Sequence, residues 1–219
     1  MVSPRILVID VGGTNVKVST AGRKAPLKIP SGPQMTPARM AAEVRKATAG
    51  WKYDAVSIGY PGAVKRGKPA HEPHNLGRGW MRFDYAKAFG VPVKIVNDAA
   101  MQALGAYSGG RMLFLGLGTG LGSAMVADGV LVPLELAHMP YRRGRTYEDY
   151  LGLRGMKRLG QKKWTRHAHR VVVLLKAGLQ ADEVVLGGGQ TKKLDALPPG
   201  VRVTGNESAI RGGLRLWDA

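Results

Sequence analysis

The chain contains no cysteine, which excludes disulfide bonds and every metal site built on thiolates. Long apolar runs are also missing. The apolar run nearest the N-terminus, Ile6 to Ile9, is short and ends at Asp10. We therefore expect neither a signal peptide nor a membrane-spanning segment. Aromatic residues make up 6% of the chain and apolar residues 44%, which is typical of a globular domain. These features favour a cytoplasmic protein in a reducing compartment.

Acidic residues are scarce as well. The 219 residues include 15 Asp and Glu against 33 Lys and Arg, which gives a formal net charge of +18. Such a surface attracts polyanions and speeds their encounter with the protein. The candidate partners are nucleic acid, an anionic membrane surface and inorganic polyphosphate. The alternative is a generally basic surface with no specific partner.

What the chain has in abundance is glycine, and two glycine-rich turns stand out. One covers residues 10–14 (DVGGT) and the other residues 116–120 (GLGTG), and each follows a short apolar strand. Shifting the sequence by about half its length places Gly12 on Gly118, so one strand–turn–strand unit is used twice. Glycine allows a close backbone approach, and successive N–H groups in such a turn bind anions. The pair predicts phosphate binding by Gly12, Gly13, Thr14, Gly118, Thr119 and Gly120, with ordinary hairpins as the alternative.

Strands and helices alternate along the chain, which predicts an α/β fold. We expect strand pairs over 5–21 and 112–132, single strands over 55–59, 93–96 and 184–186, and a loop over 24–37. We expect helices over 38–49, 83–89, 99–107, 147–159, 163–177 and 208–217. The repeat suggests two similar lobes around a cleft. The predicted division is an N-terminal lobe over 1–108, rejoined by 206–219, and a C-terminal lobe over 109–205.

Asn97 and Asp98 lie where the strand over 93–96 ends and a helix begins. Asp98 could be an N-cap. However, the carboxyl end of a strand in an α/β sheet is also where ligands bind. The sequence therefore makes Asp98, which lies between the two glycine turns along the chain, a candidate general base.

Several other motifs weigh less. Residues 62–69 resemble a phosphate-binding loop but have Pro69 where Ser or Thr is needed. Residues 116–122 lack the third glycine and the later acid of a dinucleotide-binding motif. Glu135 and His138 could begin a zinc site, but nothing nearby completes it, so hydrogen bonding to a polyhydroxy ligand or a plain surface turn is favoured.

A basic stripe recurs every four residues in the second half of the chain, at Arg154, Arg158, Lys162, Arg166 and Arg170. Further basic residues lie nearby in the sequence, at Arg142, Arg143, Arg145, Lys157 and Lys163. On a helix this spacing keeps side chains near one face. Stripes of this kind are usually solvated surface. Because the same span offers only Glu148 and Asp149 in return, it is also a candidate track for a polyanion.

Taken together, the motifs over 10–14, 97–98, 116–120 and 187–189 resemble the ROK-family sugar kinases, and the polyphosphate glucokinases among them in particular. The stretches 75–80, 128–133, 135–138, 164–167 and 186–194 carry the finer likeness. The resemblance implies an actin-like, hexokinase-like ATPase fold with two RNase H-like lobes. The cysteine zinc motif of many ROK kinases is absent, and the family's E-L-G-H reads E-L-A-H here.

The resemblance also implies roles for single residues. Asp98 would be the general base on the sugar 6-hydroxyl, and Asp10 would position magnesium through water. Sugar hydroxyls would be bound by Asn75, Asn97, Asp98, Glu135 and His138. The nucleotide side would be lined by Gly187, Gly188 and Gly189. Magnesium is the expected cofactor and zinc is not expected.

The sequence thus predicts a cytoplasmic sugar kinase, expected to form a homodimer, that phosphorylates glucose with inorganic polyphosphate, and with ATP as a further donor. Neither a membrane nor nucleic acid is an expected partner. One alternative is an ATP-dependent hexose or amino-sugar kinase of the same family. The alternative from another class is a non-catalytic sugar sensor or nucleic-acid-binding regulator. The acid at Asp98 and the lack of a helix-turn-helix segment ahead of the first strand argue against this last possibility.

Overall fold

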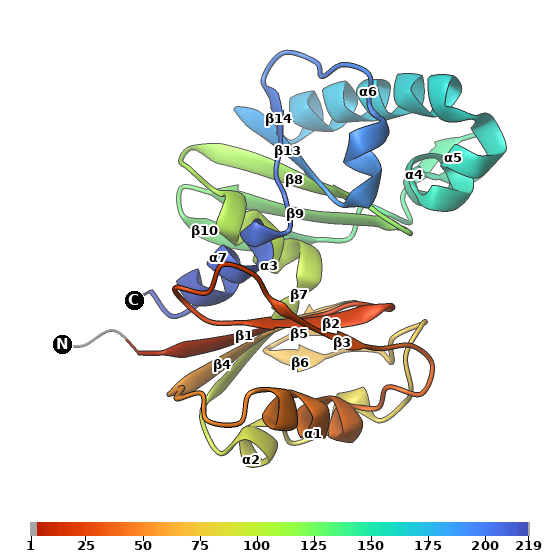
Figure 1. The fold of residues 1–219 in the computed structure, drawn as a ribbon. Coiled ribbons are helices and arrows are strands. Elements are labelled where there is room, and N and C mark those ends of the chain that lie inside the picture. Colours follow the sequence, from red (N-terminus) through yellow and green to blue (C-terminus); the bar gives the residue numbers. More distant parts are fainter. Residues whose placement is uncertain (1–3, 219) are drawn as a thin grey trace. The chain divides into compact units, whose positions relative to one another are not determined.

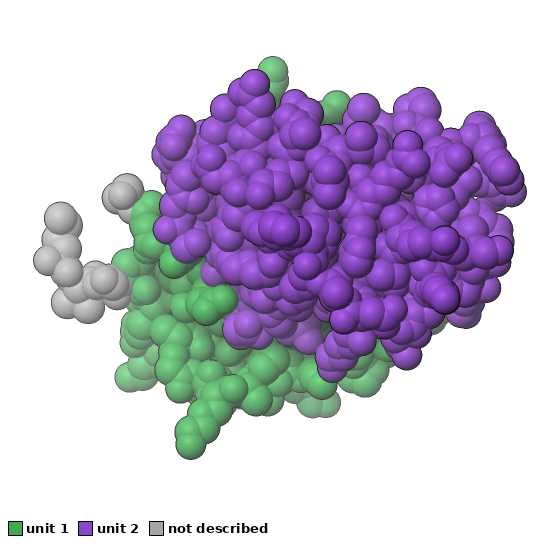
Figure 2. Space-filling model, turned by 90° about the horizontal axis from the view of Figure 1, so that it is seen from above, with its two compact units in different colours: residues 1–101, 209–219 green, residues 102–208 purple. Residues whose placement is uncertain are grey.

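The computed structural model describes residues 4–218. It divides into two compact units, which Figure 2 shows in separate colours. Unit 1 contains the chain up to Met101 and again from Ala209 onward, and unit 2 contains Gln102–Ser208. The first boundary therefore falls inside a helix, earlier in the chain than the predicted end of the N-terminal lobe at residue 108.

Unit 1 is built on a five-stranded sheet with the order β3-β2-β1-β4-β7. Its strands are β1 (Ile6–Val11), β2 (Asn15–Ser19), β3 (Leu27–Pro30), β4 (Ala55–Tyr60) and β7 (Val93–Asn97). The first three pair antiparallel, while β4 and β7 run parallel to β1. A small hairpin of β5 (Val64–Lys65) and β6 (Lys68–Pro69) adds to them. The helical segments are α1 (Pro37–Ala47), η1 (Trp80–Arg82), α2 (Tyr85–Phe89), α3 (Asp98–Ala106) and α7 (Glu207–Arg215), the last two of which cross the unit boundaries.

Every residue of β1 is buried, because the sheet of unit 1 is covered on both faces. Successive side chains of a strand point to opposite faces. Leu7 and Ile9 accordingly belong to the core that includes Met40 of α1. Ile6 and Val8 belong to a second cluster, with Met101 of α3 and Ala209 of α7. This packing fixes the register of β1 and, with it, the position of the turn after this strand.

Unit 2 repeats the strand order as β10-β9-β8-β13-β14 (Figure 1). Its strands are β8 (Arg111–Leu117), β9 (Leu121–Ala127), β10 (Val130–Leu134), β13 (Glu183–Gly187) and β14 (Val201–Val203). A short hairpin, β11 (Pro140–Arg142) and β12 (Arg145–Thr146), precedes α4 (Tyr147–Leu151), α5 (Leu153–Leu159) and α6 (Gln161–Gly178), and η2 (Gly189–Lys193) comes after β13. As in unit 1, the first three strands pair antiparallel and the other two are parallel to the central one. The predicted repeat and α/β class are confirmed.

Three predicted elements were wrong in detail. The expected loop over 24–37 contains β3, an edge strand in which Ile29 is buried while Lys28 and Pro30 are exposed. The expected strand pair over 112–132 is a set of three strands. The expected helix over 147–159 is broken at Gly152, whose N–H donates to the Glu148 carbonyl at 2.8 Å before the chain becomes extended.

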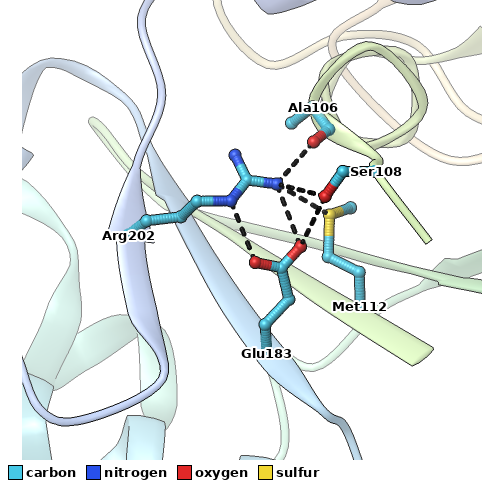
Figure 3. A network of polar contacts seen from close by, with 5 residues as sticks. All are labelled: Ala106, Ser108, Met112, Glu183 and Arg202. Atoms are coloured by element: carbon cyan, nitrogen blue, oxygen red, sulfur yellow. Dashed lines mark hydrogen bonds and ion pairs between the residues drawn. The ribbon is translucent and has the colours of Figure 1, made fainter. Parts of the chain in front are cut away.

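Arg202 joins three elements of unit 2 (Figure 3). Its guanidinium donates to both carboxylate oxygens of Glu183 on β13, each at 2.9 Å. It also donates to the Ala106 carbonyl at 2.6 Å, so a cation satisfies the C-terminal end of α3. This network holds the end of α3 to the edge of the sheet of unit 2.

Candidate functional site

The carboxyl ends of three parallel strands in unit 1 bring the predicted acids together. Asp10 pairs with Gly59 across β1 and β4, and Tyr60 pairs with Asn97 across β4 and β7. A side chain at Gly59 would strike the end of Met101 and approach the Asp98 Cα to 3.5 Å. Glycine at this position therefore lets the start of α3, which carries Asp98, lie close against the sheet.

Asn97, rather than Asp98, satisfies most of the N-terminus of α3. Its Oδ1 accepts from the N–H groups of Ala99 and Ala100 at 3.0 and 3.2 Å, and its Nδ2 donates to the Gly62 carbonyl at 3.0 Å. The Asp98 carboxylate accepts the Ala99 N–H at 2.8 Å and also the N–H of its own residue. Its hydrogen bonds are therefore local and come from the backbone at the start of α3. Asn97 positions the helix, and only its second amide hydrogen is left for a ligand.

Asp98 has the electrostatics of a base working near neutral pH. Burial in the first place, and the neighbouring Asp10 carboxylate in the second, raise the pKa of Asp98 to about 7. The Ala99 N–H and the Lys17 ammonium act in the opposite direction. Asp10 itself is buried and accepts from Lys17 Nζ at 3.2 Å. The two acids therefore differ: Asp10 has a cationic partner, whereas Asp98 holds its proton up to about pH 7.

The first glycine turn, residues 10–14, is closed by a hydrogen bond from the Gly12 N–H to the Asn15 carbonyl at 3.1 Å. Ser31, directly after β3, supports the turn, since its hydroxyl donates to the Gly12 carbonyl at 2.6 Å. A Cβ on Gly13 would lie 3.3 Å from the Cβ of Asn75. The predicted sugar ligand Asn75 is thus brought against the first glycine turn, within unit 1.

The second glycine turn, residues 116–120, connects β8 to β9 in unit 2. The Gly118 N–H donates to the Gly120 carbonyl at 3.1 Å, and a Cβ on Gly118 would meet nothing within 4 Å. Gly120 is crowded by the carboxylate of Glu148, which also accepts the Leu121 N–H at 3.2 Å. The turn is therefore open at Gly118 and supported by an acid at its other end.

Helix α4 ties the predicted sugar-binding loop to this second turn. The Glu148 N–H donates to the Ala137 carbonyl at 2.9 Å, between the predicted ligands Glu135 and His138. Those two side chains are exposed, with His138 Nε2 3.8 Å from Glu135 Oε1. The sequence did not identify Glu148 as a site residue, because its only signal was a position at the start of a helix.

The glycines 187–189 divide into two kinds. Side chains at Gly187 and Gly188 would strike the Phe114 ring and the Leu117 carbonyl. Gly188 also has a φ of 89°, which a residue with a Cβ adopts at a cost. These two glycines let β13 approach β8, whereas Gly189 is open.

The basic stripe predicted at four-residue spacing is divided over two helices. Arg154 and Arg158 lie on α5, and Lys162 and Arg166 lie on α6, with Gly160 at a φ of 73° between the helices. Arg158 donates to the Asp149 carbonyl at 2.8 Å and lies over the Tyr150 ring. The stripe is therefore not one helical face.

No group of three or more His, Asp or Glu residues suited to a metal ion occurs among residues 4–218. Magnesium bound to a phosphate donor needs less, because the phosphates and water supply most of its ligands and one or two carboxylates complete the set. Asp10, which is buried at the start of the first glycine turn, fits that requirement. No helix in the described part of the chain is long and apolar enough to cross a membrane.

Comparison with known proteins identifies the relatives of this chain, although no family model matches it. The polyphosphate glucokinase of Mycobacterium tuberculosis (strain CDC 1551 / Oshkosh) is 26% identical over 219 residues, covering 87% of this chain and 80% of the relative. The chain is a relative of the polyphosphate glucokinases.

Solved structures agree with that relationship. The inorganic polyphosphate/ATP-glucomannokinase of Arthrobacter sp. strain KM superposes with a TM-score of 0.80 at 25% identity, covering 98% of both chains. A ROK-family glucokinase from Streptomyces griseus, solved with glucose and AMPPNP, gives a TM-score of 0.77 at 17% identity over 98% of this chain and 99% of that one. The hexokinase-like, actin-like ATPase fold of ROK kinases is confirmed, and the chain is a phosphotransferase of that kind.

Proposed function

We propose that this protein is a glucokinase that transfers the terminal phosphoryl group of inorganic polyphosphate, and of ATP as a second donor, to the 6-hydroxyl of glucose. The observation that carries the proposal is Asp98, an acid at a strand end whose pKa is raised to about 7 next to Asp10. It occurs in a chain related over 87% of its length to polyphosphate glucokinases. A base with such a pKa is half ionised at neutral pH and accepts a proton from a hydroxyl as it attacks phosphorus.

The remaining site residues take roles around this base. Backbone N–H groups of the two glycine turns, with Thr14 and Thr119, bind phosphate oxygens, as such turns do elsewhere. Asn75, Asn97, Glu135 and His138 hydrogen-bond sugar hydroxyls, and Gly189 lies on the nucleotide side with Gly187 and Gly188 behind it. Transfer then depends on positioning and on charge stabilisation.

Magnesium is part of this proposal. Asp10 would hold the ion through water, and the bound ion would neutralise charge on the transferred phosphoryl group. Lys17, whose Nζ lies 3.2 Å from the Asp10 carboxylate, would hold that carboxylate in place. We also propose a homodimer that works in the cytoplasm; light scattering after size exclusion tests the first point.

Formation of glucose 6-phosphate from glucose tests the function, with long-chain polyphosphate, ATP or no donor, and with and without EDTA. The expected result is product from polyphosphate that depends on magnesium. Product from ATP alone would favour the ATP-dependent hexose or amino-sugar kinase. No product from any hexose or donor, together with DNA retained in a filter-binding assay, would favour a regulator.

A further inference from the structure

A groove of about 280 Å³ on unit 2 is lined by basic side chains that the site above does not use. Its lining residues, which we call the basic groove, are Arg142, Lys163, Arg166, His167 and Arg170. Arg142 comes from β11 and the other four from α6. Positions 163, 166, 167 and 170 have the spacing i, i+3, i+4, i+7, which places them on one face of the helix.

Within the described part of the chain, the cations of the basic groove have no acidic partners. The side chains of Arg142, Lys163, Arg166 and Arg170 are exposed, and none forms an ion pair with a carboxylate among residues 4–218. Like charges three and four residues apart destabilise a helix slightly. Other faces of α6 meet the core through Trp164 and Val171. The sequence thus keeps several uncompensated positive charges together, an arrangement that an anion would stabilise.

His167, the aromatic residue that lines the basic groove, packs against Tyr141 and Tyr150. His167 lies edge-on to Tyr150, with ring centroids 4.6 Å apart, and its Nδ1 is 3.1 Å from the Tyr141 hydroxyl. Burial first, and then Arg142, Arg166 and Arg170, lower the pKa of His167, which disfavours a positive charge on its ring. The positive charge of the groove therefore comes mainly from the arginine and lysine side chains that line it.

Helix α4 lies between the basic groove and the second glycine turn. Tyr147 and Tyr150 of α4 pack against Tyr141, with centroids 5.2 and 5.0 Å apart. Glu148, on the same helix, reaches the N–H of Leu121 at the end of the turn. A helix with its side chains is about 10–12 Å across. The basic groove and the second glycine turn thus both lie next to α4, with a helix of this width separating them.

We propose that the basic groove binds internal phosphates of a linear polyphosphate whose terminal phosphate lies at the second glycine turn. This rests on the proposed function in one respect, namely that polyphosphate is the donor. The groove would hold the part of the chain that does not react and would raise the affinity for long chains only. ATP and tripolyphosphate are too short to fill both features.

Polyphosphate fits the basic groove better than single-stranded nucleic acid does. Proteins that bind single strands combine a basic groove with aromatic faces on which bases stack. Here the aromatic rings pack against one another rather than offering faces to bases, because Tyr141 contacts Tyr147, Tyr150 and His167. What the groove provides for a ligand is positive charge and hydrogen bonds from guanidinium groups, and both suit phosphate oxygens.

The kinetic test compares Arg166→Gln/Arg170→Gln with the control Arg39→Gln/Lys46→Gln, which removes the same charge from exposed positions on α1 of unit 1. The KM for long-chain polyphosphate should rise about tenfold in the groove variant, and its salt dependence should weaken. The KM values for ATP, tripolyphosphate and glucose should stay within about twofold, as should all values of the control. Equal effects of both variants, or an equal effect on long and short donors, would overturn the proposal.

Binding without catalysis separates this inference from the proposed function. Fluorescently labelled long-chain polyphosphate is titrated with each protein in the absence of glucose, and single-stranded DNA of similar charge is titrated in the same way. Weaker polyphosphate binding by the groove variant alone is expected, even if the wild type transfers no phosphoryl group from polyphosphate. Suppose that the wild type phosphorylates glucose with polyphosphate and that the groove variant still binds polyphosphate normally. This result would overturn the proposed role of the groove and leave the proposed kinase activity intact. If the wild type bound DNA more tightly than polyphosphate, and the groove variant lost that DNA binding, polyphosphate would be excluded as the ligand of the groove.

Discussion

The two units have the same strand order, yet the residues at the corresponding strand ends differ in chemical character. In unit 1, Asp10 pairs with Gly59 at the carboxyl ends of β1 and β4. In unit 2 the corresponding pair is Gly116 and Gly187, on β8 and β13. One sheet therefore presents a carboxylate, with Asp98 close by, and the other presents bare backbone. The repeat preserves the scaffold, while its strand ends differ: one carries the proposed base and the other the proposed phosphate-binding turn.

The units also differ in the segment between their third and fourth large strands. Between β3 and β4, unit 1 has only α1, with Met40 and Val44 in its core. Between β10 and β13, unit 2 has β11, β12 and three helices, which supply Glu148 and the whole basic groove. Residues that would choose the donor are thus concentrated in the inserted segment, whereas those of the repeated strands would serve any phosphate donor.

The strongest test of the difference between the strand ends is Asp98→Asn. We expect kcat to fall about 10²–10⁴-fold, because general-base catalysis is lost, with the glucose KM changed little. Steady-state kinetics with both donors measures this. Asp54→Asn is the matched control, since Asp54 forms an exposed ion pair with Arg5 at 2.8 Å. More than about half of the wild-type kcat in Asp98→Asn would exclude Asp98 as the base.

The glycines of unit 2 allow a sharper comparison between an open and a packed position. Gly118→Val adds a side chain where nothing lies within 4 Å, so we expect normal folding and a loss of donor use of about tenfold or more, with sugar binding unchanged. Gly188→Ala strikes the Leu117 carbonyl at a positive φ and should lower the free energy of unfolding by about 1–3 kcal/mol. Donor KM and thermal unfolding are measured for both. Unchanged donor kinetics in Gly118→Val would rule out phosphate binding by this turn.

The sequence predicted those features that local chemistry dictates. The glycine turns, the acid after β7 and the repeated strand order can be inferred from glycine spacing and apolar alternation, and the structure contains each turn and strand. It did not predict β3, because Pro30 and the surrounding glycines and prolines resemble a loop until the edge of the sheet is known. Glu148 was missed for a similar reason: only the fold brings it to Leu121.

The basic stripe shows most clearly what could not be predicted from the sequence. Arg154 and Arg166 share a four-residue period in the sequence, but the break at Gly160 puts them on different helices. The groove combines Arg166 and Arg170 of the stripe with Lys163 and with Arg142 from a separate hairpin. Spacing along one helix can be predicted from sequence, whereas the meeting of a hairpin with a helix depends on tertiary packing.

The raised pKa of Asp98 predicts opposite effects of pH on activity and stability. Since the base must be ionised, kcat/KM should fall as the pH drops below about 7. Between its ordinary pKa and about 7 the folded protein holds a proton that the unfolded chain releases, so stability declines as the pH rises through this range. Asp98→Asn should remove that decline, making the variant more stable than the wild type by about 1 kcal/mol or more at about pH 8.5.

Urea unfolding of both proteins at about pH 5 and about pH 8.5 measures this difference. The Asp54→Asn control should lack it, because its partner Arg5 lowers the pKa of Asp54 to about 2. Asp54 is therefore ionised throughout the range tested. If the stability of Asp98→Asn and of the wild type depended on pH identically, the raised pKa of Asp98 would be wrong.

The smallest expected effect concerns Glu148, which has no counterpart at the first glycine turn, where Ser31 gives the support. In Glu148→Ala the Leu121 N–H loses its acceptor and the second turn loosens. Losing a hydrogen bond of about 0.5–1.5 kcal/mol should raise the donor KM about 2–12-fold without changing the glucose KM. Glu148→Gln retains an acceptor oxygen and should stay near the wild type. The opposite result, a lower donor KM in both variants, would mean that the carboxylate repels the donor more than it supports the turn. The second unit would then be limited in donor affinity by its own acid.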